Sequence, residues 1–516
     1  MNMKMKYLLT LMVAFFATTT LVACSNDDDK DNGGGTPVSQ LTVRPLSLSF
    51  DSKGGEAVIR AQAPSQVSAT SNADWCAVTV GTQSGDTKIT PVTVTVAANP
   101  TTYERTAVIT ITADSQSQTV SVTQAEGSAA VPSGTITKGA QDIAPLMYPG
   151  WNLGNTLEAT GNGLGAETSW QPTLTTQQVI DAVKAAGFKS VRIPCSWDVH
   201  SVNGVIDANW TARVKQVVDY CINDGLYVVL NDHWDGGWIE VQGFSKSTSS
   251  YQALNESDIT AKISRLKEIW KQIATAFKDY DEHLLFAGLN EPFQEYSLFS
   301  TRHAELTPIL VRYNQAFVEA VRATGGNNSQ RTLVVQGPST NIESSVSYMP
   351  ASLLPEPAGR LMVEVHYYDP GQFCGTYDAT GDKAYYYWGA GNHGANHNPT
   401  YGEEAYLADK FAKLKTSYTA LGFPVIIGEY AAMQRTIAGG DQDRHDASVK
   451  TYYKYLNAQA IQNAIITFAW DTNDTAGLAK ESGSSTIIDR AKAAVIGSNA
   501  MKGILEAVAE NTWNKK

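Results

Sequence analysis

Two glutamates of the chain stand in contexts that suit acid–base and nucleophilic chemistry. Glu291 lies in Asn290-Glu291-Pro292 and Glu429 in Gly428-Glu429-Tyr430, and each follows a short apolar run. Hydrolysis of a glycosidic bond with retention of configuration requires two carboxyl groups about 5–5.5 Å apart, one protonated and one ionised. If folding brings Glu291 and Glu429 together, the pair could perform that reaction.

Other polar and aromatic residues follow short apolar runs in the same way. They are Arg192, His233 with Trp234 and Trp238, His366 with Tyr368, and Trp470. Each of them alone has a structural explanation, such as a surface ion pair for Arg192. Their shared place at the ends of apolar runs favours one common site. There Arg192 would keep Glu429 ionised, and the neighbouring carboxylate would favour the protonated form of Glu291.

Residues 140–516 alternate short apolar runs with longer amphipathic runs. We expect strands at residues 151–152, 191–194, 228–231, 286–289, 333–335, 362–365, 425–428 and 465–468. We expect helices at residues 177–186, 209–223, 259–278, 311–323, 406–420 and 447–463. The eight alternations predict an α/β fold, a (β/α)8 TIM barrel, with an open doubly wound sheet as the alternative. Active sites of such barrels lie at the carboxyl ends of the strands, so the residues that follow the strands should meet there.

Residues 38–125 have the pattern of a small all-β domain. Thr, Ser, Val and Ala predominate, and apolar residues alternate with polar ones. This predicts an immunoglobulin-like β-sandwich, joined to the barrel by a linker at residues 126–139. Asp74-Trp75-Cys76 and the strands expected at residues 106–112 and 120–124 resemble the BACON domain. Trp75 is the only tryptophan of this segment, so we expect its ring in the core and a spacer role for the domain.

The first residues resemble an export signal. A basic start and an apolar run precede Leu21-Val22-Ala23-Cys24, which predicts a signal peptide at residues 1–23. The last four residues resemble a bacterial lipobox, which would make Cys24 a lipidated N-terminus. Residues 24–37 are acidic and then glycine-rich, which predicts a flexible tether and resembles the surface-export signal of Bacteroides-type lipoproteins. The implied location is the outer face of the outer membrane, held by a lipid anchor.

Composition narrows the range of partners. The formal net charge is −12, which argues against nucleic acid because a basic surface is needed to neutralise phosphates. A neutral polysaccharide fits this charge. The five cysteines show no metal-binding spacing. We therefore expect no metal, no cofactor and a monomer.

Residues 140–516 resemble glycoside hydrolase family 5 over essentially their whole length. The resemblance is carried by Val191-Arg192-Ile193-Pro194, Asn231 to His233, Asn290-Glu291-Pro292, His366-Tyr367-Tyr368, Gly428-Glu429-Tyr430 and Trp470. Within that family, the segment from Gly150 to Thr156 resembles subfamily 4, which acts on cellulose-like β-1,4-glucans, mixed-linkage glucan and xyloglucan. Asn155 in this segment is a candidate substrate-binding residue.

The resemblance implies a role for each matched residue. Glu291 would be the acid/base and Glu429 the nucleophile. Around them, Arg192 and Tyr368 would hydrogen-bond the nucleophile, His233 and Asn290 would hold sugar hydroxyls, His366 would lie near the acid/base, and Trp470 would form the floor under the sugar that is cut.

One position departs from the family pattern. Members often carry two adjacent histidines after strand three, whereas here His233 is followed by Trp234. The added flat ring could change which sugar fits, so Trp234 and the nearby Trp238 are candidate substrate-binding residues. A long loop at residues 369–404 adds Trp388, whose ring could stack on a sugar or pack the loop itself.

The function implied is a retaining endo-β-1,4-glucanase that cleaves internal linkages of plant β-glucans. One alternative is an endo-β-mannanase or glucomannanase on the same scaffold. Another is a surface lipoprotein that binds glycans without cleaving them, although both glutamates speak against it. A metal-dependent barrel hydrolase is disfavoured because Trp151-Asn152, rather than a histidine pair, ends the first expected strand.

Overall fold

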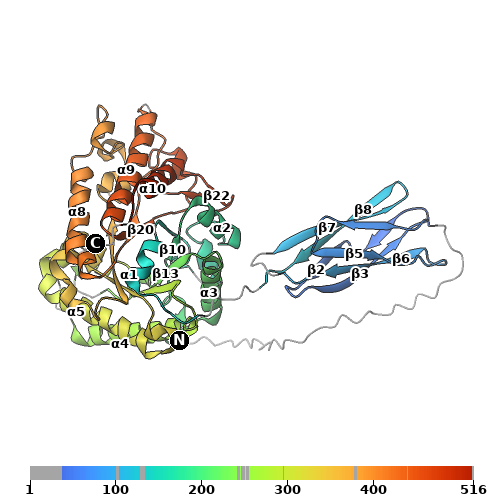
Figure 1. Cartoon of the computed structure of the whole chain (residues 1–516), viewed down its shortest axis with the longest axis horizontal. Coiled ribbons are helices and arrows are strands. Elements are labelled where there is room, and N and C mark those ends of the chain that lie inside the picture. The colour runs from blue at the N-terminus through green and yellow to red at the C-terminus, as the bar shows by residue number, and fades with distance from the viewer. Residues whose placement is uncertain are drawn as a thin grey trace, which may run out of the picture. The chain divides into compact units, whose positions relative to one another are not determined.

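The computed structural model describes residues 38–99, 104–127, 134–161, 163–240, 244–245, 250–251, 255–293, 296–376, 380–438 and 440–513. The predicted signal peptide, the predicted lipidation site Cys24 and the predicted tether lie outside these residues. The chain forms two compact units, a β-sandwich and a larger barrel, which are described separately (Figure 1).

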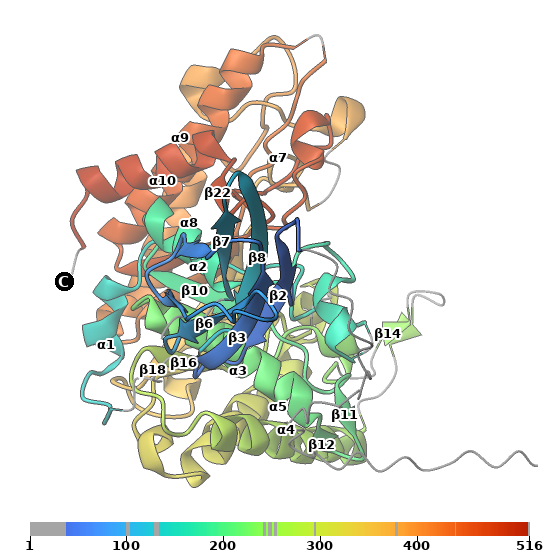
Figure 2. The ribbon, with the colours of Figure 1, turned by 90° about the vertical axis from the view of Figure 1, so that its right-hand side faces the viewer.

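The β-sandwich consists of two four-stranded sheets, with strand orders β1-β3-β6-β5 and β2-β8-β7-β4. In Figure 2, β2, β8 and β7 of the second sheet lie side by side. Buried valines and isoleucines alternate with exposed residues along β6 and β7, so the side chains of one face of each strand form the core. The strands are β1 (Thr42–Arg44), β2 (Ser47–Phe50), β3 (Gly55–Gln62), β4 (Ser68–Ser71), β5 (Cys76–Val80), β6 (Ile89–Val96), β7 (Arg105–Ala113) and β8 (Gln116–Gln124).

The larger unit is a closed barrel of eight parallel strands, in the order β10-β13-β16-β17-β18-β19-β20-β9. Its strands are β9 (Gly150–Asn152), β10 (Ser190–Ile193), β13 (Tyr227–Asn231), β16 (Leu284–Ala287), β17 (Leu333–Gln336), β18 (Leu361–Tyr367), β19 (Val425–Tyr430) and β20 (Ile465–Ala469). The barrel closes because β9 pairs with both β10 and β20. The predicted (β/α)8 barrel is therefore confirmed, and the open sheet is excluded.

Helices surround the barrel strands (Figure 1). The longer ones are α2 (Gln177–Ala186), α3 (Ala208–Asn223), α4 (Glu256–Ala276), α5 (Tyr296–Ala323), α6 (Ile342–Tyr348), α8 (Glu404–Ser417), α9 (Gln442–Gln462) and α10 (Ser498–Glu510). Helix α5 begins 15 residues before the predicted start. The prediction missed its first part because the helix is kinked at Arg302 and contains Pro308. Helices α6 and α10 were not predicted; α10 lies against α9 (Figures 1 and 2). Among the described residues, no helix is both long and apolar enough to cross a membrane.

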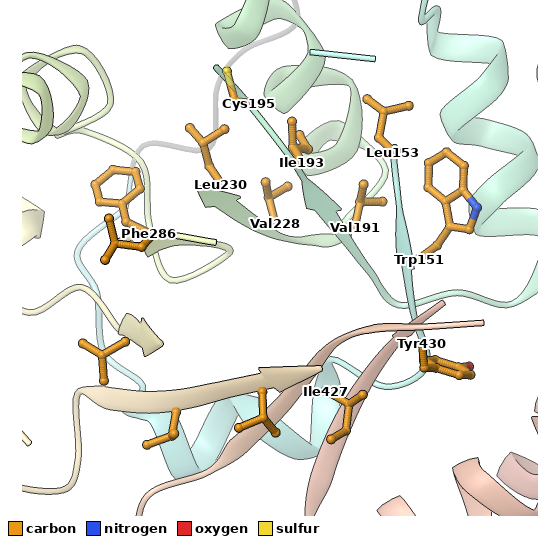
Figure 3. Packing of buried hydrophobic residues seen from close by; sticks show 14 of the residues in the cluster. Trp151, Leu153, Val191, Ile193, Cys195, Val228, Leu230, Phe286, Ile427 and Tyr430 are labelled. Atoms are coloured by element: carbon orange, nitrogen blue, oxygen red, sulfur yellow. The ribbon is translucent and has the colours of Figure 1, made fainter. Parts of the chain in front are cut away.

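Barrel strands are buried on both faces, and successive side chains alternate between them. Val191, Ile193, Val228 and Leu230 pack in the layer between strands and helices (Figure 3). Residues of the opposite parity, such as Val229, Leu285, Met362 and Ile426, form a separate apolar cluster inside the barrel. The even-numbered polar residues of these strands, Arg192 of β10 and Glu364 and His366 of β18, therefore point into the barrel.

Strand β19 breaks this alternation once. Its pairing with β18 runs in step to Val365 and Ile427 and then shifts, so that His366 lies opposite Glu429. Gly428 is the extra residue of this bulge. Val425 and Ile427 pack outward, so a regular strand would send Glu429 outward as well. The bulge instead turns Glu429 into the barrel mouth.

Candidate active site

The predicted site residues gather at the carboxyl ends of the barrel strands. Arg192 lies within β10, His366 within β18 and Glu429 within β19. Asn290 and Glu291 follow β16 directly after Gly288 and Leu289. Glu429 and His366 were expected to come after their strands, but each is still paired within its strand.

Glu291 and Glu429 face each other. One carboxylate oxygen of each, together with a ring nitrogen of His366, forms a group in which all atoms lie within 4.8 Å of one another. The Glu291 side chain is 29% exposed and the Glu429 side chain 8% exposed. The two carboxyl groups are therefore close together, as in a retaining pair and unlike the roughly 6.5–9.5 Å of an inverting pair, and Glu291 is the more exposed of the two.

Glu429 is held by a cation and a phenol. Arg192 Nη1 donates to Oε1 at 3.0 Å, and the Tyr368 hydroxyl donates to Oε2 at 3.0 Å. Burial raises the pKa of Glu429 above its usual value and Glu291 raises it further, although His366, Arg192 and the Tyr368 hydroxyl act in the opposite direction. The two donors fix both carboxylate oxygens, which suits a nucleophile that must attack along one line.

Glu291 has a different partner. His366 Nδ1 lies 2.8 Å from Glu291 Oε1 and 3.7 Å from Glu429 Oε2. Burial alone would lower the pKa of His366, but Glu429, Glu291 and Glu364 raise it to about 9. His366 is thus a cation at neutral pH, placed between the Glu291 and Glu429 carboxylates.

Arg192 orients the polar floor of the site. Its guanidinium donates to Asn290 Oδ1 at 2.7 Å and to Asn152 Oδ1 at 3.0 Å, in addition to Glu429. Its Nε lies 2.8 Å from Glu364 Oε1, and both side chains are fully buried. With its oxygen held by Arg192, Asn290 has its amide N–H groups available for a ligand.

His233 and Trp470 present parallel rings. Their centroids are 6.0 Å apart with an interplanar angle of 11°. Burial lowers the pKa of His233 well below its usual value, and Arg192 and His366 lower it further. The Asn231 amide nitrogen lies 3.2 Å from Nδ1 of this neutral ring, so Nδ1 accepts and Nε2 carries the proton, available to a sugar hydroxyl.

The Trp470 ring is fixed from behind. Its backbone N–H donates to Tyr430 O at 2.9 Å. A Cβ on Gly154 would lie 2.6 Å from the Asp471 carbonyl oxygen and 3.0 Å from the Trp470 ring, so the loop after β9 can approach this segment only because residue 154 is glycine. The next residue, Asp471, accepts from Trp151 Nε1 at 3.0 Å. This buried anchor holds the half-buried indole at the barrel mouth.

The remaining aromatic candidates differ in position. Trp234 is 42% exposed, and Trp238 is half-buried against the main core. Trp388, by contrast, is fully buried; its Nε1 donates to Gly402 O at 2.9 Å and its ring packs edge-on against Tyr452. The predicted role of Trp388 in stacking on sugar is therefore wrong, because no face of its ring is accessible.

Asn155 shapes the loop after β9. Its φ of 59° is left-handed, and its backbone N–H donates to the buried Glu158 carboxylate. Burial raises the pKa of Glu158 to about 7, although backbone donors and Arg490 oppose this shift. The structure thus places Asn155 in a turn beside the Trp470 platform, where a substrate-binding role stays a prediction.

Two buried partners of Arg192 are absent from the predicted residues: Asn152 and Glu364. Both are fully buried inside the barrel. Glu364 interrupts an apolar run in β18, and an ionisable group in a buried strand must have a charged or hydrogen-bonding partner there. That interruption is the signal that could have identified it.

A cleft of 520 Å³ adjoins Glu291 and His366. Its lining includes Asn341, Tyr368, Asp369, Tyr401 and Tyr406. Hydroxyl, amide and carboxylate groups on its walls suit the many hydroxyls of an oligosaccharide.

The group of Glu291, His366 and Glu429 could also hold a metal ion by geometry. Its charges disfavour this. Arg192 already lies 3.0 Å from Glu429, and a metal would have to displace the proton from His366, whose pKa is about 9. Carboxylate chemistry without a metal fits this donor set better.

The sequence matches the family model described as cellulase (glycosyl hydrolase family 5) at residues 156–476. The chain belongs to glycosyl hydrolase family 5. A second family model, BACON, described as a putative N-terminal binding domain, matches residues 65–125. Both families agree with the resemblances drawn from the sequence.

Three relatives illustrate the relationship. The chain is 75% identical to the structure of XEG5B, a xyloglucan-specific β-1,4-glucanase from a ruminal metagenomic library, with a TM-score of 0.72 over 73% of this chain and 98% of that one. It is 31% identical over 450 residues to a xyloglucan-specific endo-β-1,4-glucanase of Bacteroides ovatus, covering 83% of this chain and 85% of the relative. It is 26% identical to a GH5-4 broad-specificity endoglucanase from Clostridium longisporum, with a TM-score of 0.60 over 72% and 99% of the two chains.

The raised pKa of His366 predicts a pH-dependent stability. The folded-state value of about 9 lies above the usual 6.5, so protonated His366 contributes fully below about pH 6.5, and this contribution is lost as the pH rises through 9. The pKa difference corresponds to about 3 kcal/mol. The unfolding free energy, measured by urea denaturation, should be lower at pH 9.5 than at pH 6 for the wild type. This fall should be smaller for His366→Asn, which has no imidazole to lose a proton. Equal differences in both proteins would contradict the raised pKa.

Proposed function

We propose that the protein is a retaining endo-β-1,4-glucanase that cleaves internal linkages of β-glucans. The observation that carries this proposal is the pair of Glu291 and Glu429, within 4.8 Å of each other and held by different partners. The two like groups thus have unequal surroundings, and a double displacement requires one carboxyl group that is protonated and one that is ionised. Membership of glycosyl hydrolase family 5 supports the same reaction.

In the first step, a Glu429 oxygen attacks the anomeric carbon and Glu291 gives its proton to the leaving oxygen. The glycosidic bond breaks, and the sugar is joined to Glu429 as an ester. Arg192 and Tyr368 hold the attacking carboxylate in one orientation. His233 and Asn290 donate to sugar hydroxyls in this proposal, and Trp470 supports the ring from below.

In the second step, Glu291 acts as a base. It takes a proton from a water molecule, the water oxygen attacks the anomeric carbon, and the bond to Glu429 breaks. Esterification has removed the charge of Glu429, so the cationic His366, 2.8 Å from Glu291 Oε1, then stabilises the Glu291 carboxylate. Two inversions give a product of the original β configuration.

We infer that xyloglucan is the preferred glucan and that the chain belongs to subfamily 4. The relatives described above, two xyloglucan-specific enzymes and one GH5-4 endoglucanase, support this. Trp234 adds an exposed ring where other family members often carry a histidine, and such a ring can pack against a xylose branch. Mixed-linkage glucan is the alternative substrate. Glucomannan would be a further substrate if the cleft also accepts mannose units.

We also propose that the enzyme is a lipoprotein at the outer face of the outer membrane. The basis is the sequence alone, namely the lipobox-like residues before Cys24 and the acidic stretch behind it. A spacer domain between the anchor and the barrel would hold the cleft away from the lipid surface.

Removal of the nucleophile tests the catalytic assignment. Glu429→Ala should lower reducing-sugar release from soluble glucans by roughly 10³-fold or more, because no covalent intermediate can form. Glu319→Ala is the control, since Glu319 lies on the surface of α5 and pairs there with Lys267 of α4. Wild-type activity in Glu429→Ala would refute the site, and binding without cleavage by both proteins would favour a glycan-binding protein.

The stereochemistry of the reaction is a separate test. NMR of the first product should show the β anomer, and an α anomer would contradict retention.

The ring of Trp234 should matter for branched substrate. Trp234→Ala should raise KM for xyloglucan roughly three- to tenfold, because a stacking surface is lost, and should change KM for mixed-linkage glucan less. Trp513→Ala is the control, since Trp513 stacks on Tyr148 near the amino end of β9. Equal effects of Trp234→Ala on both glucans would remove Trp234 as a determinant of specificity.

Lipidation of Cys24 can be measured directly. In cells fed a palmitate analogue, the wild-type protein should be labelled and should sediment with membranes, whereas Cys24→Ala should lose the label. Cys76→Ala, which changes a buried cysteine of the sandwich, should keep it. A labelled Cys24→Ala protein would overturn this anchor.

A further inference from the structure

We propose that Glu364 is a positioning residue that fixes both cations of the active site and the backbone that presents Glu429. The inference rests on the proposed function, because it concerns the same carboxylate pair. Glu364 lies in β18 with the inward parity of Met362, and it is fully buried. It contacts neither solvent nor the open cleft, so it acts through its neighbours.

One oxygen of Glu364 bridges the two cations. Oε1 lies 2.8 Å from Arg192 Nε and 3.5 Å from His366 Nε2. The far side of each cation contacts a catalytic carboxylate: Arg192 contacts Glu429, and His366 contacts Glu291. Glu364 therefore determines where both positive charges stand relative to the reacting groups.

The other oxygen fixes Glu364 itself. Oε2 accepts a hydrogen bond of 2.6 Å from Gln336 Nε2 on β17. Gln336 Oε1 in turn accepts from the backbone N–H of Leu289 at 2.8 Å. Leu289 lies two residues before Glu291, so one chain of hydrogen bonds links Glu364 to the backbone that carries the acid/base.

Glu364 also explains why residue 428 is glycine. A Cβ on Gly428 would lie 1.9 Å from Glu364 Oε1, the same oxygen that bridges the cations. Gly428 is the extra residue of the bulge that turns Glu429 inward. The carboxylate therefore fills the space that a side chain at 428 would need, and it packs against the bulge that aims the nucleophile.

Glu364→Gln tests this inference, because it keeps the shape of the side chain and removes its charge. We expect kcat to fall roughly 10²-fold with KM changed less than about twofold, since misplaced reacting groups affect the transition state more than binding. We also expect His366 to lose its proton at lower pH, measured by NMR titration of histidine-labelled protein. The charged or titratable groups that face His366 in this experiment are Glu291, Glu364, Glu429, Arg192, His233 and Tyr368.

Glu167→Gln is the matched control. Glu167 is also a buried glutamate, and it pairs with Arg213 at 2.8 Å outside the site. Glu167→Gln should lower the melting temperature by about as much as Glu364→Gln does, but it should leave kcat within twofold of the wild-type value. Equal losses of kcat and melting temperature in the two variants would reduce Glu364 to a structural role and overturn the proposal.

Failure of the inference differs from failure of the proposed function. If the wild type releases sugar and Glu364→Gln matches its kcat, KM and pH profile, only the inference is wrong. If the wild type cleaves no β-glucan, the proposed function is wrong, and the His366 titration alone then decides the role of Glu364. An unchanged titration in Glu364→Gln would overturn that role.

Discussion

The buried guanidinium of Arg192 is the interaction on which the barrel mouth depends. It joins β10 to Asn152 on β9, Asn290 after β16, Glu364 on β18 and Glu429 on β19. A fully buried cation is tolerable only when nearly all of its donors meet acceptors, so each partner is needed for stability as well as for chemistry. Loss of Glu364 or Glu429 would leave positive charge uncompensated at the centre of the barrel, and loss of Asn152 or Asn290 would leave a buried N–H donor without its acceptor.

A second constraint is geometric. Alternation along a strand places every other residue inside the barrel, and a regular β19 would direct Glu429 to the helices. The bulge at Gly428 removes that conflict, and Glu364 occupies the space that the glycine leaves. Charge and backbone shape are thus coupled at one position, because the oxygen that bridges Arg192 and His366 is the one that excludes a side chain at residue 428.

The sequence predicts the fold and the meeting of Glu291 with Glu429 well, because both depend on local signals. Apolar runs mark the strands, and the residues after them share one face of the barrel. Prediction fails where the outcome depends on packing between distant segments. Nothing local shows that Trp388 is covered by Tyr452, or that Glu364 meets Arg192, 172 positions away. The sequence prediction misses the first part of α5 because a proline such as Pro308 usually marks the end of a helix or its first turn.

Glu364 also keeps the net charge of the site at zero through the proposed cycle. Before attack, Arg192 and His366 are cationic, Glu364 and Glu429 are anionic, and Glu291 carries a proton, so these five side chains sum to zero. In the glycosyl-enzyme, Glu429 is an uncharged ester and Glu291 is anionic, and the sum is again zero. Only the position of one negative charge changes, and His366 contacts both of its locations, at 2.8 Å and 3.7 Å. Without Glu364, the same cycle would run with an uncompensated buried positive charge, which would stabilise the glutamates as anions and oppose proton transfer from Glu291.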